Sequence, residues 1–407
     1  MKLKYSILIP TMNGGRYLIH AINSVLQSSN SNFELVISIN HSIDDTEELL
    51  KSIHDSRIRI IRPIEKLSMA AHYEWCIENA RGEWITILGD DDGLMPDFFP
   101  HCDYLLNKWR DISAISFKRA YFFWPNSADV FGDTILHYIK NSKEKIRYSK
   151  IDLLLVLAGL KEHYDLPQLY TNNLISKSLI DSIKKKSFGK FYHEVTPDVY
   201  SGVAISLSIA KYLKIGKPLF WTGSSPKSMG VAIAKSKTNN HNINKNENSL
   251  EHFDLAEKDG LSIATEINSL LYKKSDFALN IYVLSGLFNI PFNFKFINKK
   301  FLEYIVYGSA FAKNILPSSL RLDSSSLFKK YFYSHIKSRK LNIIVIKIFF
   351  IFSFILISLK HVYSLFKKYA SILININSEK NKLMYIKKRN GLNSISDANN
   401  FLKGNQL

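Results

Sequence analysis

The chain has 407 residues, of which 46% are hydrophobic and 13% aromatic, and it carries a formal net charge of +18. This length and apolar content predict a folded domain of roughly 200–250 residues with accessory parts, which excludes a disordered chain. Residues 291–407 hold 20 Lys or Arg and 4 Asp or Glu, a balance of +16, which leaves +2 for the first 290 residues. A nucleic-acid enzyme is expected to carry its basic surface on the catalytic domain, so the distribution argues against that class.

The first 90 residues alternate between short apolar runs and stretches with the apolar spacing of a helix. This alternation is typical of a parallel sheet covered by helices, so we expect an α/β fold with a Rossmann-like, mostly parallel sheet. The expected strands are Tyr5–Pro10, Phe33–Ile39, Arg57–Arg62 and Glu83–Leu88, and the expected helices are Arg16–Gln27, Asp44–Ile53 and Ser68–Ala80.

Three polar segments follow strands of this predicted sheet: Thr11–Gly15, Asn40–Asp45 and Asp90–Gly93. In open α/β sheets, ligands bind beyond the carboxyl ends of the strands. We therefore expect the three segments to meet at one edge of the sheet and to form a binding site there.

The consecutive carboxylates Asp90, Asp91 and Asp92 are the strongest candidates for chemistry in that site. Three adjacent carboxylates repel one another, and after an apolar strand a bound cation would explain them better than a solvated acidic turn does. Mg²⁺ and Mn²⁺ prefer carboxylate and water oxygens, and Mg²⁺ commonly takes one or two protein carboxylates. The segment therefore predicts a site for one of these two ions.

Further strands are expected near Ile112–Arg119 and around Pro218–Trp221. We divide the chain into a sheet-containing domain at 1–235, a polar linker or loop at 236–249, a mainly helical accessory region at 250–335, and a basic, apolar tail at 336–407.

Within the tail, the 17 residues Ile343–Leu359 are interrupted only by Lys347, Ser353 and Ser358. Seventeen residues are at the short end for crossing a bilayer of ~30 Å. Basic residues flank the tract on both sides, which favours a helix lying on an anionic membrane surface. A membrane span, a solvated Lys-rich tail and a helix buried in an oligomer are the alternatives.

The chain shows no secretion signal and no cysteine framework. Cys76 and Cys102 are the only cysteines, and their spacing indicates neither a zinc site nor disulfides. The expected location is the cytoplasm, at the inner face of the cell membrane.

Several segments together resemble the family 2 glycosyltransferases, which have the A-type glycosyltransferase fold. Tyr5–Asn13, read as YSILIPTMN, resembles the first strand and nucleotide-binding loop of that family. Ala80–Asp92, read as ARGEWITILGDDD, resembles the approach to its metal motif, and Gly93–Pro96 continues the likeness. The resemblance is strong over residues 5–100, weaker to about 230 and absent beyond.

The resemblance implies an inverting transfer of a sugar from a nucleoside-diphosphate donor, with Mn²⁺ or Mg²⁺ as cofactor. The implied acceptor is a saccharide or lipid-linked saccharide in bacterial-type surface polysaccharide assembly, and nucleic acid is not a partner. By matching position, the donor-binding roles fall on Pro10, Thr11 and Asn13.

The same matching assigns the acidic triplet. Asp92 is the expected metal ligand, Asp90 faces the ribose or the metal directly or through water, and Asp91 belongs to the donor side. The family has an acidic residue after its second strand that contacts the nucleotide base, and here Ile39-Asn40 stands in that place. Asn40 retains a donor and an acceptor, so it stays a donor-binding candidate while the choice of base is open.

An inverting transfer needs a carboxylate to take the proton of the acceptor hydroxyl. The family places it about 100 residues past the metal motif, at a helix start, where this chain has Asp198, with Glu194 in reserve. Thr196 and Pro197 suit the start of a helix, so helix capping alone also explains Asp198. His193 is a further candidate for the metal.

The segment Gly223–Ser228 is either part of the site or a plain surface turn. In the first case, Lys227 would approach the diphosphate and Trp221 would stack on a sugar. Two other functions stay open. A metal-dependent nucleotidyltransferase also uses paired carboxylates, and a non-catalytic nucleotide-sugar-binding subunit would keep the donor site without needing Asp198.

Overall fold

The computed structural model of the chain describes residues 3–30, 32–125, 127, 136–139 and 143–228, followed by shorter pieces of the C-terminal half. Those pieces are 255–256, 258–261, 286, 289–291, 304–305, 342, 344–356, 358–359, 383–386 and 392–404. The linker expected at 236–249 lies outside the described residues, as does most of the accessory region expected at 250–335.

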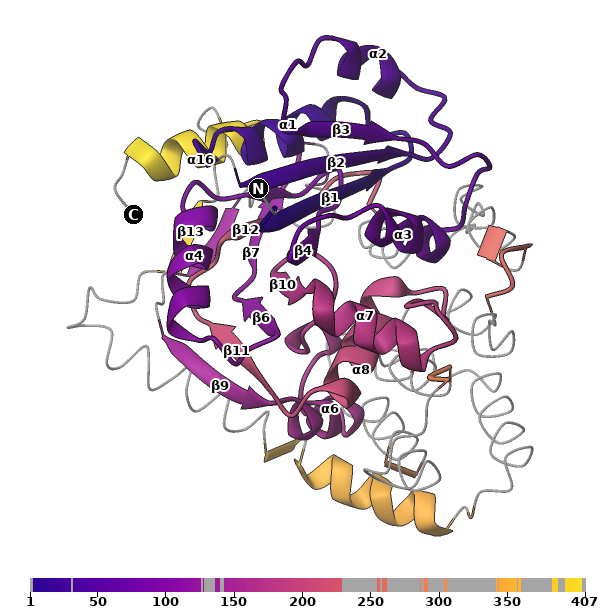
Figure 1. The fold of residues 1–407 in the computed structure, drawn as a ribbon. Coiled ribbons are helices and arrows are strands. Elements are labelled where there is room, and N and C mark those ends of the chain that lie inside the picture. Colours follow the sequence, from indigo (N-terminus) through magenta and orange to yellow (C-terminus); the bar gives the residue numbers. More distant parts are fainter. Residues whose placement is uncertain are drawn as a thin grey trace, which may run out of the picture.

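An eight-stranded sheet forms the centre of the molecule, in the order β3-β2-β1-β4-β10-β6-β11-β9 (Figure 1). Strands β3, β2, β1 and β4 run parallel, as do β6 and β11, whereas β10 is antiparallel to both of its neighbours and β9 to β11. The strands are β1 (Tyr5–Thr11), β2 (Phe33–Ile39), β3 (Ile58–Ile61), β4 (Trp84–Ile87), β6 (Ala114–Phe117), β9 (Glu144–Tyr148), β10 (Asn173–Ser176) and β11 (Lys211–Ile215).

Helices cover both faces of this sheet, so β1 and β2 are buried along their whole length. Successive side chains of a strand point to opposite faces. Leu8 and Val36 accordingly pack into the core beneath α3, α6, α7 and α8, whereas Ile7 and Leu35 pack beneath α1 and α4. The helical elements are α1 (Gly15–Leu26), α2 (Thr46–Lys51), α3 (Met69–Glu78), α4 (Phe98–Lys108), α6 (Ser149–Leu157), the 3₁₀ helix η1 (His163–Asp165), α7 (Lys177–Lys186), α8 (Pro197–Ser208) and α16 (Ile395–Gly404).

The α/β fold class and the seven elements predicted for the first 90 residues are confirmed, with each end within two residues of its predicted position. The strands expected near Ile112–Arg119 and Pro218–Trp221 are also present, as β6 and β12. Strand β7 follows β6 directly.

A second sheet, which the sequence did not predict, has the order β13-β8-β7-β12-β5. Strand β12 is parallel to β7 and antiparallel to β5, so it lies between two strands from a part of the chain about 100 residues earlier. The pairing within this sheet brings backbone groups of β5 and β12 close to the carboxyl end of β4. Its strands are β5 (Gly93–Leu94), β7 (Ala120–Phe123), β8 (Leu136–Ile139), β12 (Phe220–Ser224) and β13 (Leu383–Ile386).

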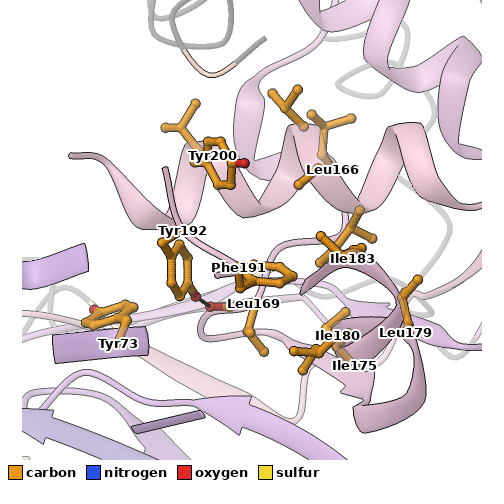
Figure 2. Packing of buried hydrophobic residues seen from close by; sticks show 14 of the residues in the cluster. Tyr73, Leu166, Leu169, Ile175, Leu179, Ile180, Ile183, Phe191, Tyr192 and Tyr200 are labelled. Atoms are coloured by element: carbon orange, nitrogen blue, oxygen red, sulfur yellow. Dashed lines mark hydrogen bonds between the residues drawn. The ribbon is translucent and has the colours of Figure 1, made fainter. Parts of the chain in front are cut away.

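A cluster of aromatic rings fills the core between α3 and α8 (Figure 2). Tyr73, Tyr192 and Tyr200 lie there beside Phe191, and the Tyr192 hydroxyl donates to the carbonyl oxygen of Leu169 over 3.4 Å. This packing fixes the start of α8 relative to the sheet.

A helix runs through residues 344–356 and 358–359 of the apolar tract. Ile346 and Ser353 are buried, and Ile346 joins the core that contains α6 and α8. The opposite side of this helix exposes large apolar side chains: Ile344, Ile348, Ile351, Phe352, Ile355 and Leu359. Within the described ranges, no helix combines the length and apolar character needed to cross a membrane.

Candidate active site

The acidic triplet lies just beyond the carboxyl end of β4, and the loop after β1 reaches it directly. The Thr11 hydroxyl donates to Asp90 Oδ2 over 2.8 Å. Gly14 packs against the same carboxylate, since a Cβ placed there would lie 2.8 Å from Asp90 Oδ2. The backbone N–H of Ile43 donates to Asn13 Oδ1 over 2.8 Å, so the segment Asn40–Asp45 contacts the loop after β1. The three segments therefore meet at one edge of the sheet, as the sequence predicted.

Asp92 is held by three donors from separate parts of the chain. The backbone N–H of Gly89 donates to Oδ2 over 2.9 Å, and that of Gly223 donates to Oδ1 over 2.7 Å. The Thr171 hydroxyl also donates to Oδ2. Asp92 is 2% exposed, so these bonds replace the water that it loses on folding.

Asp91 is fixed both through its side chain and through its backbone. The N–H of Ser225 donates to Asp91 Oδ2 over 2.9 Å, and the indole N–H of Trp124 donates to the Asp91 carbonyl over 2.8 Å. Because the segment 223–225 supplies donors to both Asp91 and Asp92, it belongs to the site and is not a plain surface turn.

The three carboxyls share an environment that disfavours their charged forms. Burial, reinforced by the negative charge of Asp91, raises the pKa of Asp90 and of Asp92 to about 7. Burial also raises the pKa of Asp91. The positive charge of Lys227 acts in the opposite direction on the Asp90 pKa. Ionising all three groups together therefore costs free energy, which a bound cation would offset.

These residues fit a Mg²⁺ or Mn²⁺ ion by their chemistry. They offer carboxylate oxygens only, and Asp90 accepts a bond from Thr11 alone among the hydrogen bonds described, whereas Asp92 accepts three. The described residues contain no group of three or more His, Cys, Asp and Glu side chains arranged to hold a metal ion. One or two carboxylates are what Mg²⁺ usually takes from a protein, with phosphate and water oxygens completing the shell.

Lys227 reaches the loop after β1 from the far end of β12. Its Nζ donates to the Asn13 carbonyl over 2.9 Å and lies 3.7 Å from Asp44 Oδ2. Asn13 adopts a positive φ of 63°, a left-handed conformation that Asn tolerates better than most residues. The Lys227 side chain remains 58% exposed, so a solvent-accessible cation stands beside the loop that contacts Asp90.

Two of the other predicted donor-binding residues are buried in the framework of the site. Pro10 lies within β1 and pairs with Ser38 of β2. The Asn40 amide donates to the Leu67 carbonyl over 2.8 Å and accepts from the Leu67 N–H over 2.9 Å. As found, Asn40 positions the start of α3, and contact with a nucleotide base would require one of these bonds to open.

Asp198 lies at the second residue of α8, with Thr196 at the N-cap position, so the predicted helix start is confirmed. Its side chain is 36% exposed, and its Oδ2 lies 3.9 Å from Nε2 of His163. Burial lowers the pKa of His163, and the negative charge of Asp198 opposes that shift. The Nδ1 atom of His163 is buried without a hydrogen-bond partner.

Two tyrosines link Asp198 to the triplet. The rings of Tyr73 and Tyr170 stack with their centroids 6.1 Å apart. Burial, together with the charges of both Asp198 and Asp92, raises the pKa of each hydroxyl well above its usual value. The negative charges of Asp198 and of the triplet therefore raise the pKa values of the same two hydroxyls.

Glu194 and His193 are engaged by their own surroundings. Glu194 is 1% exposed, and its carboxylate accepts bonds from the N–H and the hydroxyl of Thr196. The Nε2 of His193 lies 3.1 Å from the carbonyl oxygens of Ser187 and Lys190. That nitrogen therefore donates to the backbone, which leaves Nδ1 as the atom of His193 able to bind a metal.

The expectation that Trp221 stacks on a sugar is wrong. Its side chain is completely buried, and its indole N–H donates to Asn399 Oδ1 over 2.7 Å. The sequence also failed to indicate Thr171 as a partner of the triplet, and it gave Ser225 no role of its own within the segment Gly223–Ser228. No local pattern marks them, because each is brought to the site by pairing of strands distant in sequence.

An open α/β sheet with buried carboxylates at the carboxyl ends of its strands defines a ligand-binding domain of the doubly wound class. Residues 6–155 match the family described as Glycosyl transferase family 2. This segment of the chain is therefore similar to glycosyl transferase family 2.

Individual known proteins are also similar to parts of the chain. The chain is 29% identical over 89 residues to Glycosyltransferase GlyG of Streptococcus pneumoniae serotype 4, covering 21% of this chain and 30% of that protein. It is 26% identical over 214 residues to an uncharacterized glycosyltransferase of Haemophilus influenzae, covering 52% of this chain and 79% of the relative. The chain spans 30% to 32% of the length of the first three curated relatives.

Among solved structures, S. aureus TarS in complex with UDP-GlcNAc aligns with a TM-score of 0.48 at 11% identity. The alignment covers 83% of this chain and 80% of that one.

Gly223→Ala tests the packing of β12 on the triplet. A Cβ at Gly223 would lie 1.8 Å from the Asp91 carbonyl oxygen, so the strand has to move away and withdraw its N–H from Asp92. We expect a loss of about 3 kcal/mol in the free energy of unfolding, measured by urea denaturation. The control is Gly286→Ala, in a helix, where the nearest atom would be 3.5 Å away and stability should hold or rise. Equal stability of the two variants would contradict the packing described.

Proposed function

We propose that the protein is an inverting glycosyltransferase that moves a sugar from a nucleoside-diphosphate donor to a saccharide or lipid-linked saccharide acceptor. The proposed setting is the assembly of surface polysaccharide. One observation carries it: in a segment that matches family 2, three consecutive carboxylates lie at the strand ends, Asp90 accepts a bond from Thr11 of the loop 11–15, and the cation Lys227 contacts the same loop.

The donor is proposed to lie between that loop and the triplet. Lys227 would pair with the diphosphate, since its ammonium group is exposed and sits beside Asn13 and Asp44. Thr11 and Asn13 shape the floor of the same site.

A divalent cation, Mn²⁺ or Mg²⁺, would be held by Asp92 and Asp90, directly or through water. When bound, such an ion neutralises the charge that develops on the departing diphosphate. The raised pKa values of both groups support the assignment, because burial and the charge of Asp91 disfavour their ionised forms and a bound cation would offset that cost. Asp91 holds the segment 223–225 in place by accepting a hydrogen bond from the Ser225 N–H.

Asp198 is proposed as the general base. The acceptor hydroxyl loses its proton to the Asp198 carboxylate while its oxygen attacks the anomeric carbon and the diphosphate departs. The partial exposure of Asp198 at a helix start suits that role, and His163 lies close enough to steady the carboxylate. Glu194 is the reserve candidate, although its bonds to Thr196 favour a structural role.

Metal-dependent nucleotide binding is the first test. Titration calorimetry of UDP, GDP, CDP and ADP with Mn²⁺ should show one preferred nucleoside diphosphate, whose binding is lost on adding EDTA. Asp90→Asn and Asp92→Asn should each weaken this binding at least tenfold, since even outer partners of a metal contribute about 10- to 100-fold. Asp111→Asn, at an exposed loop position, should bind as wild type does. Binding that is indifferent to Mn²⁺ in every case would overturn the metal assignment.

Asp198→Asn tests the base. Turnover should fall by about 10²- to 10⁴-fold while affinity for the nucleoside diphosphate stays the same, because the base acts on the acceptor. Asp181→Asn is the matched control: this residue is on α7, 57% exposed, and pairs with Lys177. Unchanged turnover in Asp198→Asn would remove it from the mechanism and direct attention to Glu194→Gln.

The products of the same assay separate the two rival functions. Release of a nucleoside diphosphate identifies sugar transfer, whereas release of pyrophosphate identifies a nucleotidyltransferase. Donor binding without any turnover identifies a non-catalytic nucleotide-sugar-binding subunit.

We also propose that the helix within 344–359 rests on the inner face of the cell membrane. The exposed apolar residues recur at helical spacing and lie on one side, with side chains 51% to 64% exposed. The basic residues on either side in the sequence would add ~1 kcal/mol each near anionic lipid.

Ile351→Asp with Ile355→Asp tests this contact. Flotation with vesicles of phosphatidylglycerol and phosphatidylcholine should recover at least about tenfold less of this variant than of wild type, because each buried Ile is worth ~1.5–3 kcal/mol. Ile64→Asp, at a position 94% exposed on the catalytic domain, is the control and should float normally. Concentration-dependent dimerisation lost in the double variant, with flotation unaffected, would instead identify an oligomer contact.

A further inference from the structure

The C-terminal segment 392–404 docks on the sheet that supports the acidic triplet. Helix α16 lies beside α1 (Figure 1), more than 300 residues away in sequence. Ile395 and Ala398 are completely buried against Trp124 and Trp221 in one apolar cluster. This segment belongs to the tail in sequence, yet in the structure it is part of the catalytic domain's core.

Asn399 ties two strands of the second sheet together. Its Oδ1 accepts from Trp221 Nε1 over 2.7 Å, and its Nδ2 donates to the Leu94 carbonyl over 2.9 Å. Leu94 is in β5 and Trp221 is in β12, and these strands form an antiparallel pair. Asn399 is 1% exposed, so both bonds are sheltered from water and both are costly to lose.

The same two strands deliver the triplet and its donors. Asp92 immediately precedes β5, which has two residues and so little pairing of its own. Strand β12 contains Gly223, whose N–H reaches Asp92, and Ser225 follows it with an N–H on Asp91. The register between β5 and β12 therefore sets the distance between the carboxylates and their donors.

Contacts beside Asn399 reinforce this arrangement. Ile395 packs directly on Gly93, since a Cβ there would lie 2.7 Å from an Ile395 methyl. Ser396 lies 3.1 Å from Nδ1 of His20, whose ring neighbours Trp124. Trp124 in turn donates to the Asp91 carbonyl. Helix α16 thus reaches the backbone of the triplet by two routes.

We propose that Asn399 is a positioning residue for the donor site: by joining Leu94 to Trp221, it holds Asp91 and Asp92 in the arrangement that binds a nucleoside diphosphate with Mn²⁺. This inference rests on the proposed function, because the affinity it concerns is that of the proposed donor site. Asn399 touches neither donor nor metal and acts through β5 and β12.

The test compares Asn399→Ala with Asn400→Ala in the full chain. Both remove the same amide from the same helix, but Asn400 is exposed. Calorimetry measures binding of UDP, GDP, CDP and ADP in the presence of Mn²⁺, and thermal unfolding is recorded in parallel. We expect Asn399→Ala to weaken nucleotide binding about 3- to 30-fold in the folded protein and Asn400→Ala to leave it unchanged.

A purely structural role would lower the unfolding temperature of Asn399→Ala and leave the affinity of the folded protein at the wild-type value, which would overturn the proposal. If Asn399→Ala does not fold, Trp221→Phe decides, since it removes one of the two bonds and keeps an aromatic ring in the core. Wild-type affinity in Trp221→Phe would then overturn the proposal. Absence of nucleotide binding in wild type would instead overturn the proposed function itself.

Discussion

The placing of three consecutive carboxylates at one sheet edge, with Asp91 and Asp92 buried and Asp90 half-buried, is the constraint on which the rest of the site depends. Adjacent negative charges repel, and their removal from water raises the free energy of each charged form. Hydrogen-bond donors partly compensate Asp91 and Asp92 for this cost. They are the backbone N–H groups at 89, 223 and 225 and the Thr171 hydroxyl. None of these donors carries a full charge, so a bound cation would offset the remaining cost of ionising the triplet.

The small second sheet is what makes this arrangement possible. Strand β12 pairs with β5 on one side and β7 on the other, and it ends where its N–H groups meet the triplet. The large sheet contributes the other half of the site, since β1 and β4 end beside each other and bring Thr11 to Asp90. The triplet thus sits between two sheets, while Asp198 lies at the start of α8, and the charges of Asp198 and Asp92 both influence the stacked rings of Tyr73 and Tyr170.

The sequence predicted those parts of the fold that depend on local patterns. Alternating apolar runs revealed every element of the first 90 residues, and Thr196-Pro197 marked the start of α8. The meeting of the three polar segments also followed, because parallel strands present their carboxyl ends at one edge. These predictions needed only periodicity, capping and the geometry of a parallel sheet.

Other parts of the site depend on contacts between distant segments, which no local pattern records. Thr171 and Ser225 resemble ordinary loop residues until strand pairing brings them to the triplet. One of the two interpretations of the segment around Gly223–Ser228 had Trp221 stack on a sugar, but helix α16 covers this side chain. An aromatic side chain at such a strand end serves either a ligand or the core, and its neighbours in space decide which.

The docking of α16 has a consequence for synthesis of the chain. Leu94 and Asn399 are 305 residues apart, which at about 5–20 residues per second corresponds to roughly 15–60 s of translation. Trp221 and Asn399 are 178 residues apart, so for roughly 9–36 s of that interval the large sheet can form while Trp124 and Trp221 still lack the helix that covers them. The nascent protein therefore leaves these aromatic side chains uncovered until α16 has been made, and the packing that supports the acidic triplet is completed only then.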